Sequence, residues 1–194
     1  MANIFQNSLF FRYIFDCGGF VRYMLNDTFE PNWRSDKVSG SPRGMKGLSF
    51  LAKNKGNPNC FSGVPQDWID FAIELKNGLK DPRWELVSAP GYNRGNVDNI
   101  KRGDILAREF DVNKPKKDQH GHMMIAMGEP NNGRLKIADS TSKPNHTNDT
   151  RKIGDGMGKG EIKVKDNKMA WSVDLNPKLR IWVVRLKALG NVHY

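Results

Sequence analysis

Cysteine is scarce in this sequence, and long apolar runs are absent. The 194 residues include two cysteines, Cys17 and Cys60, which are too few for the disulfide framework of a small secreted domain. No apolar run reaches the roughly 20 residues of a transmembrane helix. Polar side chains interrupt residues 1–15 and no small-residue cleavage site follows them, so we do not expect this stretch to be a signal peptide. The sequence leaves the compartment open, and we expect a secreted or periplasmic location.

Acidic residues are also in short supply. The chain has 21 Asp and Glu against 31 Lys and Arg, a formal net charge of +10. Residues 151–187 alone hold ten basic and four acidic residues. This excess predicts an anionic partner such as an acidic cell-wall polymer, although the alternation at 161–165 is also typical of a solvated strand face. No zinc-ligand cluster, basic heptad helix or aromatic RNA-binding signature accompanies the charge, which disfavours nucleic acid.

Cys17 has the sequence surroundings of a nucleophilic thiol. Apolar residues at 20, 21, 24 and 25 recur at helical spacing, so Cys17 is expected at or near a helix N-terminus. The partial positive charge there favours thiolate over thiol. Gly18 and Gly19 have no Cβ and would let a substrate carbonyl approach the backbone N–H of Cys17. A lone cysteine is also a common small buried residue, so this interpretation requires a base elsewhere in the chain.

The rest of the chain contains a polar stretch, a helix and several short β-like runs. Residues 26–64 are rich in Asn, Gly, Ser, Pro and Lys, which is typical of a long loop insertion. Residues 65–78 predict a helix with Pro in its first turn and Gly after its end. From residue 101 onward, short apolar runs predict an antiparallel sheet of about five strands, with a Gly-rich basic loop around 154–160. We therefore predict one α+β domain over residues 1–194, with N-terminal helices that carry the nucleophile packed on a C-terminal sheet.

The base is expected in a hairpin made by residues 121–128 and 133–140. A turn centred on residues 130 and 131 would place His122 directly opposite Asp139. A cysteine nucleophile, a histidine base and an acid that orients the imidazole form the arrangement that thiol acyl transfer needs. Cys17, His122 and Asp139 are therefore the predicted catalytic residues.

The hairpin also predicts where the sheet meets the Cys17 helix. Met124, Ala126, Leu135 and Ile137 would share a face with His122 and Asp139, since side chains alternate along a strand. Because that face is apolar, we expect it to lie against the Cys17 helix and to bring His122 to the thiol.

The other histidines leave alternatives open. His120 lies two residues before His122 on the same side of the strand, and it would act as the base if the register shifted. His120, His122 and one acid also form a weak metal-binding pattern, but no metal or other cofactor is predicted. His146 and His193 are expected at the solvated surface.

Three blocks of the sequence resemble a known family. Asp16-Cys17-Gly18-Gly19-Phe20-Val21 resembles the Asp-Cys-Ser-Gly-Phe-Val block of NlpC-type papain-like cysteine peptidases, with Gly18 where Ser is usual. Residues 102–106 resemble their Pro-Gly-Asp-Leu turn and strand. Residues 121–128 are similar to the Gly-His-Val-(Gly/Ala)-Ile-x-x-Gly strand of that family and of the related CHAP amidases.

The resemblance carries implications for the fold, the activity and the site. It implies a papain-like α+β fold and hydrolysis of amide bonds, commonly in peptidoglycan stem peptides. Asp139 falls where the third polar catalytic residue is expected. The resemblance further implies that Asp16 contacts a substrate amine and that Gly18 lies at the substrate. An esterase or acyltransferase on the same fold, and an inactive module that binds an anionic polymer, remain as alternatives.

Overall fold

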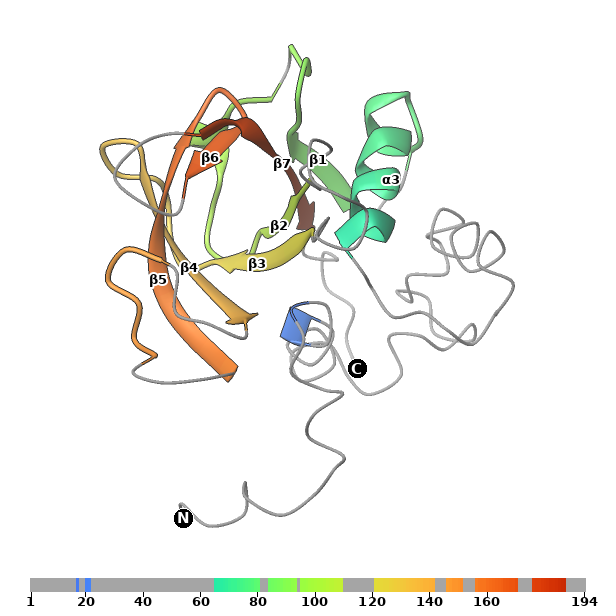
Figure 1. Ribbon diagram of the computed structural model, residues 1–194. Helices are drawn as coiled ribbons and strands as arrows, with labels where there is room; N and C mark the ends of the chain where they lie inside the picture. The colour runs from blue at the N-terminus through green and yellow to red at the C-terminus, as the bar shows by residue number, and fades with distance from the viewer. Residues whose placement is uncertain are drawn as a thin grey trace, which may run out of the picture.

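The computed structural model describes residues 17, 20–21, 65–80, 84–93, 95–109, 121–141, 146–151, 156–170 and 176–187. Seven β-strands make up most of the regular secondary structure in these ranges, and they curve into a barrel beside a single long helix (Figure 1).

The barrel closes because its last strand pairs on both edges. The strands are β1 (Trp84–Ser88), β2 (Ile105–Arg108), β3 (His122–Ala126), β4 (Arg134–Thr141), β5 (Gly156–Lys165), β6 (Lys168–Ala170) and β7 (Asn176–Leu186). They are ordered β1-β7-β2-β3-β4-β5-β6, and β6 pairs back to β7. On the edge opposite β2, the long strand β7 pairs with β6 near its start and with β1 near its end. Six strands therefore form a closed antiparallel barrel, and β1 lies outside it.

Two tight turns connect the strands of the hairpins β3–β4 and β5–β6. Asn131 pairs with Arg134 across a two-residue turn in which Asn132 and Gly133 have φ of 50° and 69°. Lys165 pairs with Lys168 across residues 166 and 167, whose φ values are 50° and 62°. Positive φ at both central positions is the type I′ geometry, which matches the right-handed twist of paired strands. Asn, Asp and Gly are the residues that tolerate this conformation.

Alternation along the strands divides the apolar side chains into two cores. The inner core fills the barrel and includes Leu106, Met124, Ala126, Leu135, Ile137, Ile162, Val164, Met169, Ile181 and Val183. The outer core lies on the outside of the barrel and includes Phe20, Val21, Trp68, Phe71, Ala72, Ile105, Met123, Ile125, Trp182 and Val184.

The helix α3 (Pro65–Lys76) covers part of the outside of the barrel. Pro at its first position has the fixed φ that a helix start requires, and Lys76 in the last turn favours the negative end of the helix dipole. Trp68 and Phe71 meet Trp84 of β1 edge to face, with ring centroids 5.4 Å and 6.1 Å apart. The predicted helix over 65–78 is confirmed.

The predicted α+β papain-like fold is wrong. The described chain is mostly sheet, and its antiparallel strands close into a six-stranded barrel. Residues 84–88 form a strand that was not expected, and the Gly-rich stretch at 156–160, predicted as a loop, belongs to β5. The predicted insertion over 26–64 lies outside the described residues. Within the parts described, no helix is long and apolar enough to cross a membrane.

Candidate active site

His122 and Asp139 meet inside the barrel at one of its ends. His122 is the first residue of β3 and Asp139 lies near the end of β4, so the antiparallel pairing brings them to the same end. The His122 Nε2 atom lies 2.5 Å from Asp139 Oδ2. The predicted contact between His122 and Asp139 is present in the structure.

The register that produces this contact differs from the predicted one. Asp139 lies directly opposite Met124, so His122 reaches it diagonally. The turn is centred on Asn132 and Gly133 rather than on residues 130 and 131. A shift of two residues keeps every side chain on its face. Diagonal neighbours in a ladder are still within reach of a long side chain.

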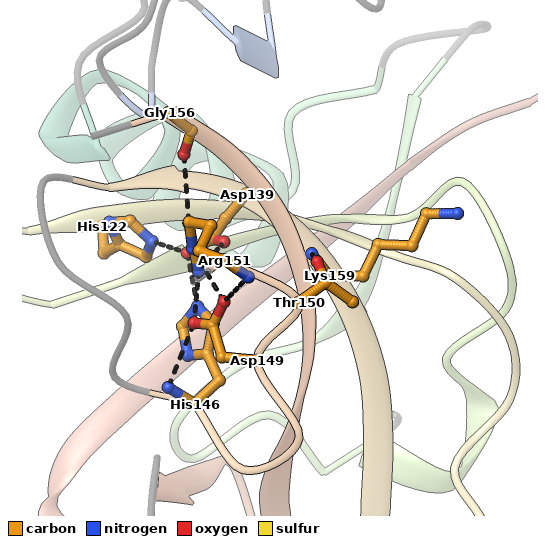
Figure 2. Close-up of polar contacts among 8 residues, drawn as sticks. All are labelled: His122, Asp139, His146, Asp149, Thr150, Arg151, Gly156 and Lys159. Carbon is orange, nitrogen blue, oxygen red and sulfur yellow. Dashed lines mark hydrogen bonds and ion pairs between the residues drawn. The ribbon is translucent and has the colours of Figure 1, made fainter. Parts of the chain in front are cut away.

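His146 binds the same carboxylate oxygen from another part of the chain. Its Nε2 atom lies 2.7 Å from Asp139 Oδ2, and its side chain is fully buried. The segment 146–151 runs beside β5, where Thr147 accepts a hydrogen bond from Glu161 N and Thr150 N donates to Lys159 O. Figure 2 shows His122 and His146 approaching Asp139 from different directions. The expectation of a solvated His146 is wrong.

Arg151 completes the surroundings of Asp139. Its Nη2 atom lies 3.0 Å from Asp139 Oδ1 and 2.7 Å from Asp149 Oδ2. Its Nε and Nη1 atoms donate to Asp149 Oδ1 and to the carbonyl of Gly156, at 2.9 Å and 3.2 Å. The guanidinium therefore joins the two carboxylates and ties them to the start of β5 (Figure 2).

Two glycines in β5 make room for this network. A Cβ atom on Gly160 would lie 2.5 Å from the His146 Cβ, and one on Gly158 would lie 2.6 Å from the Arg151 Nε. Gly158 is directly opposite Asp139 in the ladder. Glycine inside a strand often marks a close approach of another segment. The Gly-x-Gly pattern at 158–160 is the one sequence signal that another segment packs closely here. A glycine-rich stretch also predicts a loop, and that prediction is wrong because the stretch belongs to β5.

The electrostatics leave a charged carboxylate beside a neutral imidazole. Burial alone would raise the pKa of Asp139, but the hydrogen bonds from His122 and His146 outweigh burial and hold that pKa well below its ordinary value. Burial lowers the pKa of His122 below 6.5 despite its bond to Asp139, and Arg108, opposite it in β2, adds to the lowering. With Nε2–H donating to the carboxylate, the lone pair of a neutral His122 is on Nδ1. That nitrogen can accept a proton.

Cys17 lies on the other side of the barrel wall from the inner core. Cys17 is helical and half-buried, as part of a segment whose Phe20 and Val21 belong to the outer core. Figure 1 shows this segment by the end of β4. The outer core also contains Met123, the neighbour of His122. The face that meets this segment is therefore the Met123 face, and the prediction that the His122 face would lie there is wrong.

The remaining predicted site residues are not tested. Asp16, Gly18 and His120 lie outside the described residues, as do Cys60 and His193. The pairing of Cys17 with His122 and the two substrate contacts stay predictions.

The same cluster has the composition of a metal site. One ligand atom from each of His122, Asp139 and His146 lies within 4.8 Å of the other two, and imidazole with carboxylate is a donor set that Zn²⁺ accepts. Both imidazoles, however, are at hydrogen-bond distance from one oxygen, and Arg151 brings a positive charge to the other. A guanidinium on the only carboxylate of the set opposes a second cation. The geometry fits a hydrogen-bonded network better than a metal centre.

Comparisons with known proteins add no relative. No family model, no curated protein and no solved structure matches the chain. The resemblance of the short blocks to NlpC-type peptidases therefore stays a prediction.

Proposed function

We propose that this protein is a cysteine hydrolase in which Cys17 is the nucleophile and His122 is the general base. The observation that carries the proposal is the buried bond between His122 Nε2 and Asp139 Oδ2 at 2.5 Å. This bond orients a neutral imidazole so that Nδ1 can exchange protons with a thiol. Because His122 is the first residue of β3, we propose that Cys17 reaches Nδ1 around the end of that strand. The hydrogen bonds of His122 and His146 keep Asp139 ionised, and Arg151 Nη2 holds its other oxygen at 3.0 Å.

The proposed reaction has two stages. His122 takes the thiol proton, Cys17 sulfur attacks the substrate carbonyl, and the amide C–N bond breaks as His122 returns the proton to the leaving nitrogen. This leaves a thioester between Cys17 and the acyl group. In the second stage His122 takes a proton from water, the hydroxide oxygen attacks the thioester carbonyl, and the acid leaves as the sulfur recovers the proton.

The proposed substrate is an amide bond in an anionic polymer, with peptidoglycan stem peptides as the first candidate. The net charge of +10 supports an anionic partner, and the sequence blocks around Cys17 and His122 support amide hydrolysis. An esterase or acyltransferase would use the same thioester and differ in the group that leaves or accepts the acyl chain.

Mass spectrometry of peptidoglycan after incubation with the protein tests this function. We expect new stem-peptide termini with the unchanged protein and with Cys60→Ala, and none with Cys17→Ala. The two cysteine variants remove the same atoms, so the comparison isolates the nucleophile. Circular dichroism checks that each variant is folded. Equal turnover in a folded Cys17→Ala variant would remove Cys17 from the mechanism.

A further inference from the structure

A belt of positive charge follows the outside of the barrel over four neighbouring strands. We call this surface the basic band. It consists of outward-facing positions on β4, β5, β6 and β7, namely Arg134, Lys136, Lys159, Lys163, Lys165, Lys168 and Arg180. Among the described outward positions of β4, β5 and β6, Glu161 is the one acid.

The strand register places like charges opposite one another in this band. Arg134 pairs with Lys163, Lys165 pairs with Lys168, and Lys168 pairs with Arg180. Like charges directly opposite in a ladder destabilise a sheet. The register also pairs Lys136 with Glu161, and Glu161 Oε2 lies 3.6 Å from Arg134 Nη1. Among the described residues of these strands, Glu161 therefore provides the band's opposite charge. The three like-charge pairs cost stability, and a bound anion would offset that cost.

The band is separate from the other surfaces of the molecule. The helix α3 packs on β1, β2 and β7, and Figure 1 shows β4, β5 and β6 on the far side of the barrel from it. The candidate active site faces the inside of the same strands. Figure 2 shows Lys159 pointing away from the network around Asp139. A ligand on the band would therefore leave His122 and Asp139 uncovered.

The character of the band favours a flexible polymer over nucleic acid. Proteins that bind single-stranded nucleic acid combine basic grooves with aromatic side chains on which bases stack. The described part of the chain exposes one large hydrophobic side chain, Met157, and no aromatic one. The wall of a closed barrel is convex, which suits a flexible chain better than a stiff duplex. Charges recur about every 6.7 Å along a strand and about 4.8 Å between strands, so a linear polyanion can meet several at once.

We propose that the basic band binds a linear anionic glycan, a sugar polymer that carries carboxylate, phosphate or sulfate groups. Binding depends on charge and on the sheet register. It does not depend on the thiol chemistry, so it can be measured with Cys17 replaced by alanine. Loss of hydrolysis and loss of glycan binding are then separate results.

The test uses heparin as the sulfated glycan probe, with uncharged dextran and a short DNA duplex as comparators. Two triple variants of equal charge change are compared in the Cys17→Ala background. The band variant carries Lys163→Gln, Lys165→Gln and Lys168→Gln. The control variant carries Lys80→Gln, Lys101→Gln and Arg102→Gln, three exposed positions outside the strands that form the band.

We expect the band variant to bind heparin at least about tenfold more weakly in about 0.1 M NaCl and with a shallower salt dependence, since fewer counterions are released. The control should stay within about twofold of the parent protein, because its net charge change is the same. The thermal unfolding midpoint of the band variant should be unchanged or higher, since repulsive pairs are removed. Equal weakening in both variants, tighter binding to the DNA duplex than to heparin, or equal binding to dextran would each overturn the proposal.

Discussion

Asp139 is the residue at which His122, His146 and Arg151 meet. Two imidazoles bind one of its oxygens and a guanidinium approaches the other, while its side chain is fully buried. A buried carboxylate is costly unless hydrogen bonds and opposite charge compensate it. The three partners provide that compensation. The geometry of His122 therefore depends on residues far from it in the sequence, including His146 and Arg151.

Protonation of His122 should destabilise the protein in mild acid. The pKa of buried His122 is lower in the folded state than its ordinary value of 6.5, so the unfolded chain binds more protons between the two values. The stabilisation is thus present above about pH 6.5 and is lost as pH falls below it. Asp139, whose pKa is also lowered, adds to the loss only below about pH 4.

Thermal unfolding at about pH 7.5 and about pH 5.5 measures this effect. We expect the midpoint to fall on acidification, and to fall less in His122→Gln, which keeps a hydrogen-bond donor but cannot titrate. A midpoint that rises on acidification, or an identical fall in both proteins, would contradict the assignment of His122 as a buried neutral base.

The sequence predicted part of the site at this level of detail. His122 and Asp139 could be paired because each lies in an apolar run whose alternation fixes its face. His146 and Arg151 could not, since they sit in a polar segment and are buried only by the absence of side chains on Gly158 and Gly160. The missing side chains belong to β5, whereas the residues that they make room for lie in segment 146–151. The local sequence around His146 and Arg151 therefore gives little sign of their burial.

The two halves of strand β5 contribute differently to the structure. Its first half, Gly156 to Gly160, pairs with the end of β4 and lies under segment 146–151. The second half carries Ile162 and Val164 into the inner core. One strand therefore provides space at one end and apolar packing at the other.

Gly160→Ala should damage the site through packing. The new methyl would lie 2.5 Å from the His146 Cβ, an atom close to the backbone that cannot rotate away. We expect a loss of about 1–3 kcal/mol in the free energy of unfolding, typical of overpacking. Gly128→Ala is the matched control, because a Cβ there meets nothing within 4 Å, and it should cost less than about 0.5 kcal/mol.

Denaturant unfolding of the two glycine variants gives these free energies. Equal stability of Gly160→Ala and Gly128→Ala would mean that segment 146–151 is not held against β5 in solution. A selective loss in Gly160→Ala would support the placement of His146.

Turn chemistry explains which hairpins could be predicted. Asn132-Gly133 is a strong signal for a type I′ turn, and Asp166-Asn167 is a weaker one. The observed β3–β4 ladder is offset by two residues from the predicted pairing, which changes the register without changing the face. Overlooking the second turn hid β6, because a strand of three residues has too little periodicity to be recognised alone.

Closure of the barrel is a property of the whole chain. It depends on β6 pairing with β7 and on β7 being long enough to pair with three other strands. Neither the apolar pattern nor the turn residues specify such non-local pairing. For this reason the short antiparallel strands were predicted, while the closed barrel was mistaken for a papain-like sheet covered by helices.

Activation of the Cys17 thiol would depend on how the N-terminal helical segment and the barrel are placed together. The proposed activity requires a proton to pass from Cys17, which packs against the outer core, to His122. His122 is the first residue of β3, and its side chain faces the inside of the barrel. A coupled thiol should ionise at lower pH than an isolated one and react faster, because the thiolate is the nucleophile.

The most direct measurement is the rate of alkylation of Cys17 by iodoacetamide across pH, with Cys60 in the same protein as the internal reference. The account predicts that Cys17 reacts much faster than Cys60 near neutral pH and keeps its rate well below the ordinary thiol pKa of about 8.5. Replacement of His122 by alanine should remove this advantage, and Asp139→Asn should reduce it by less. If Cys17 and Cys60 instead react at similar slow rates that titrate near about pH 8.5, with His122→Ala unchanged, then His122 does not activate Cys17 and the proposed hydrolase is wrong.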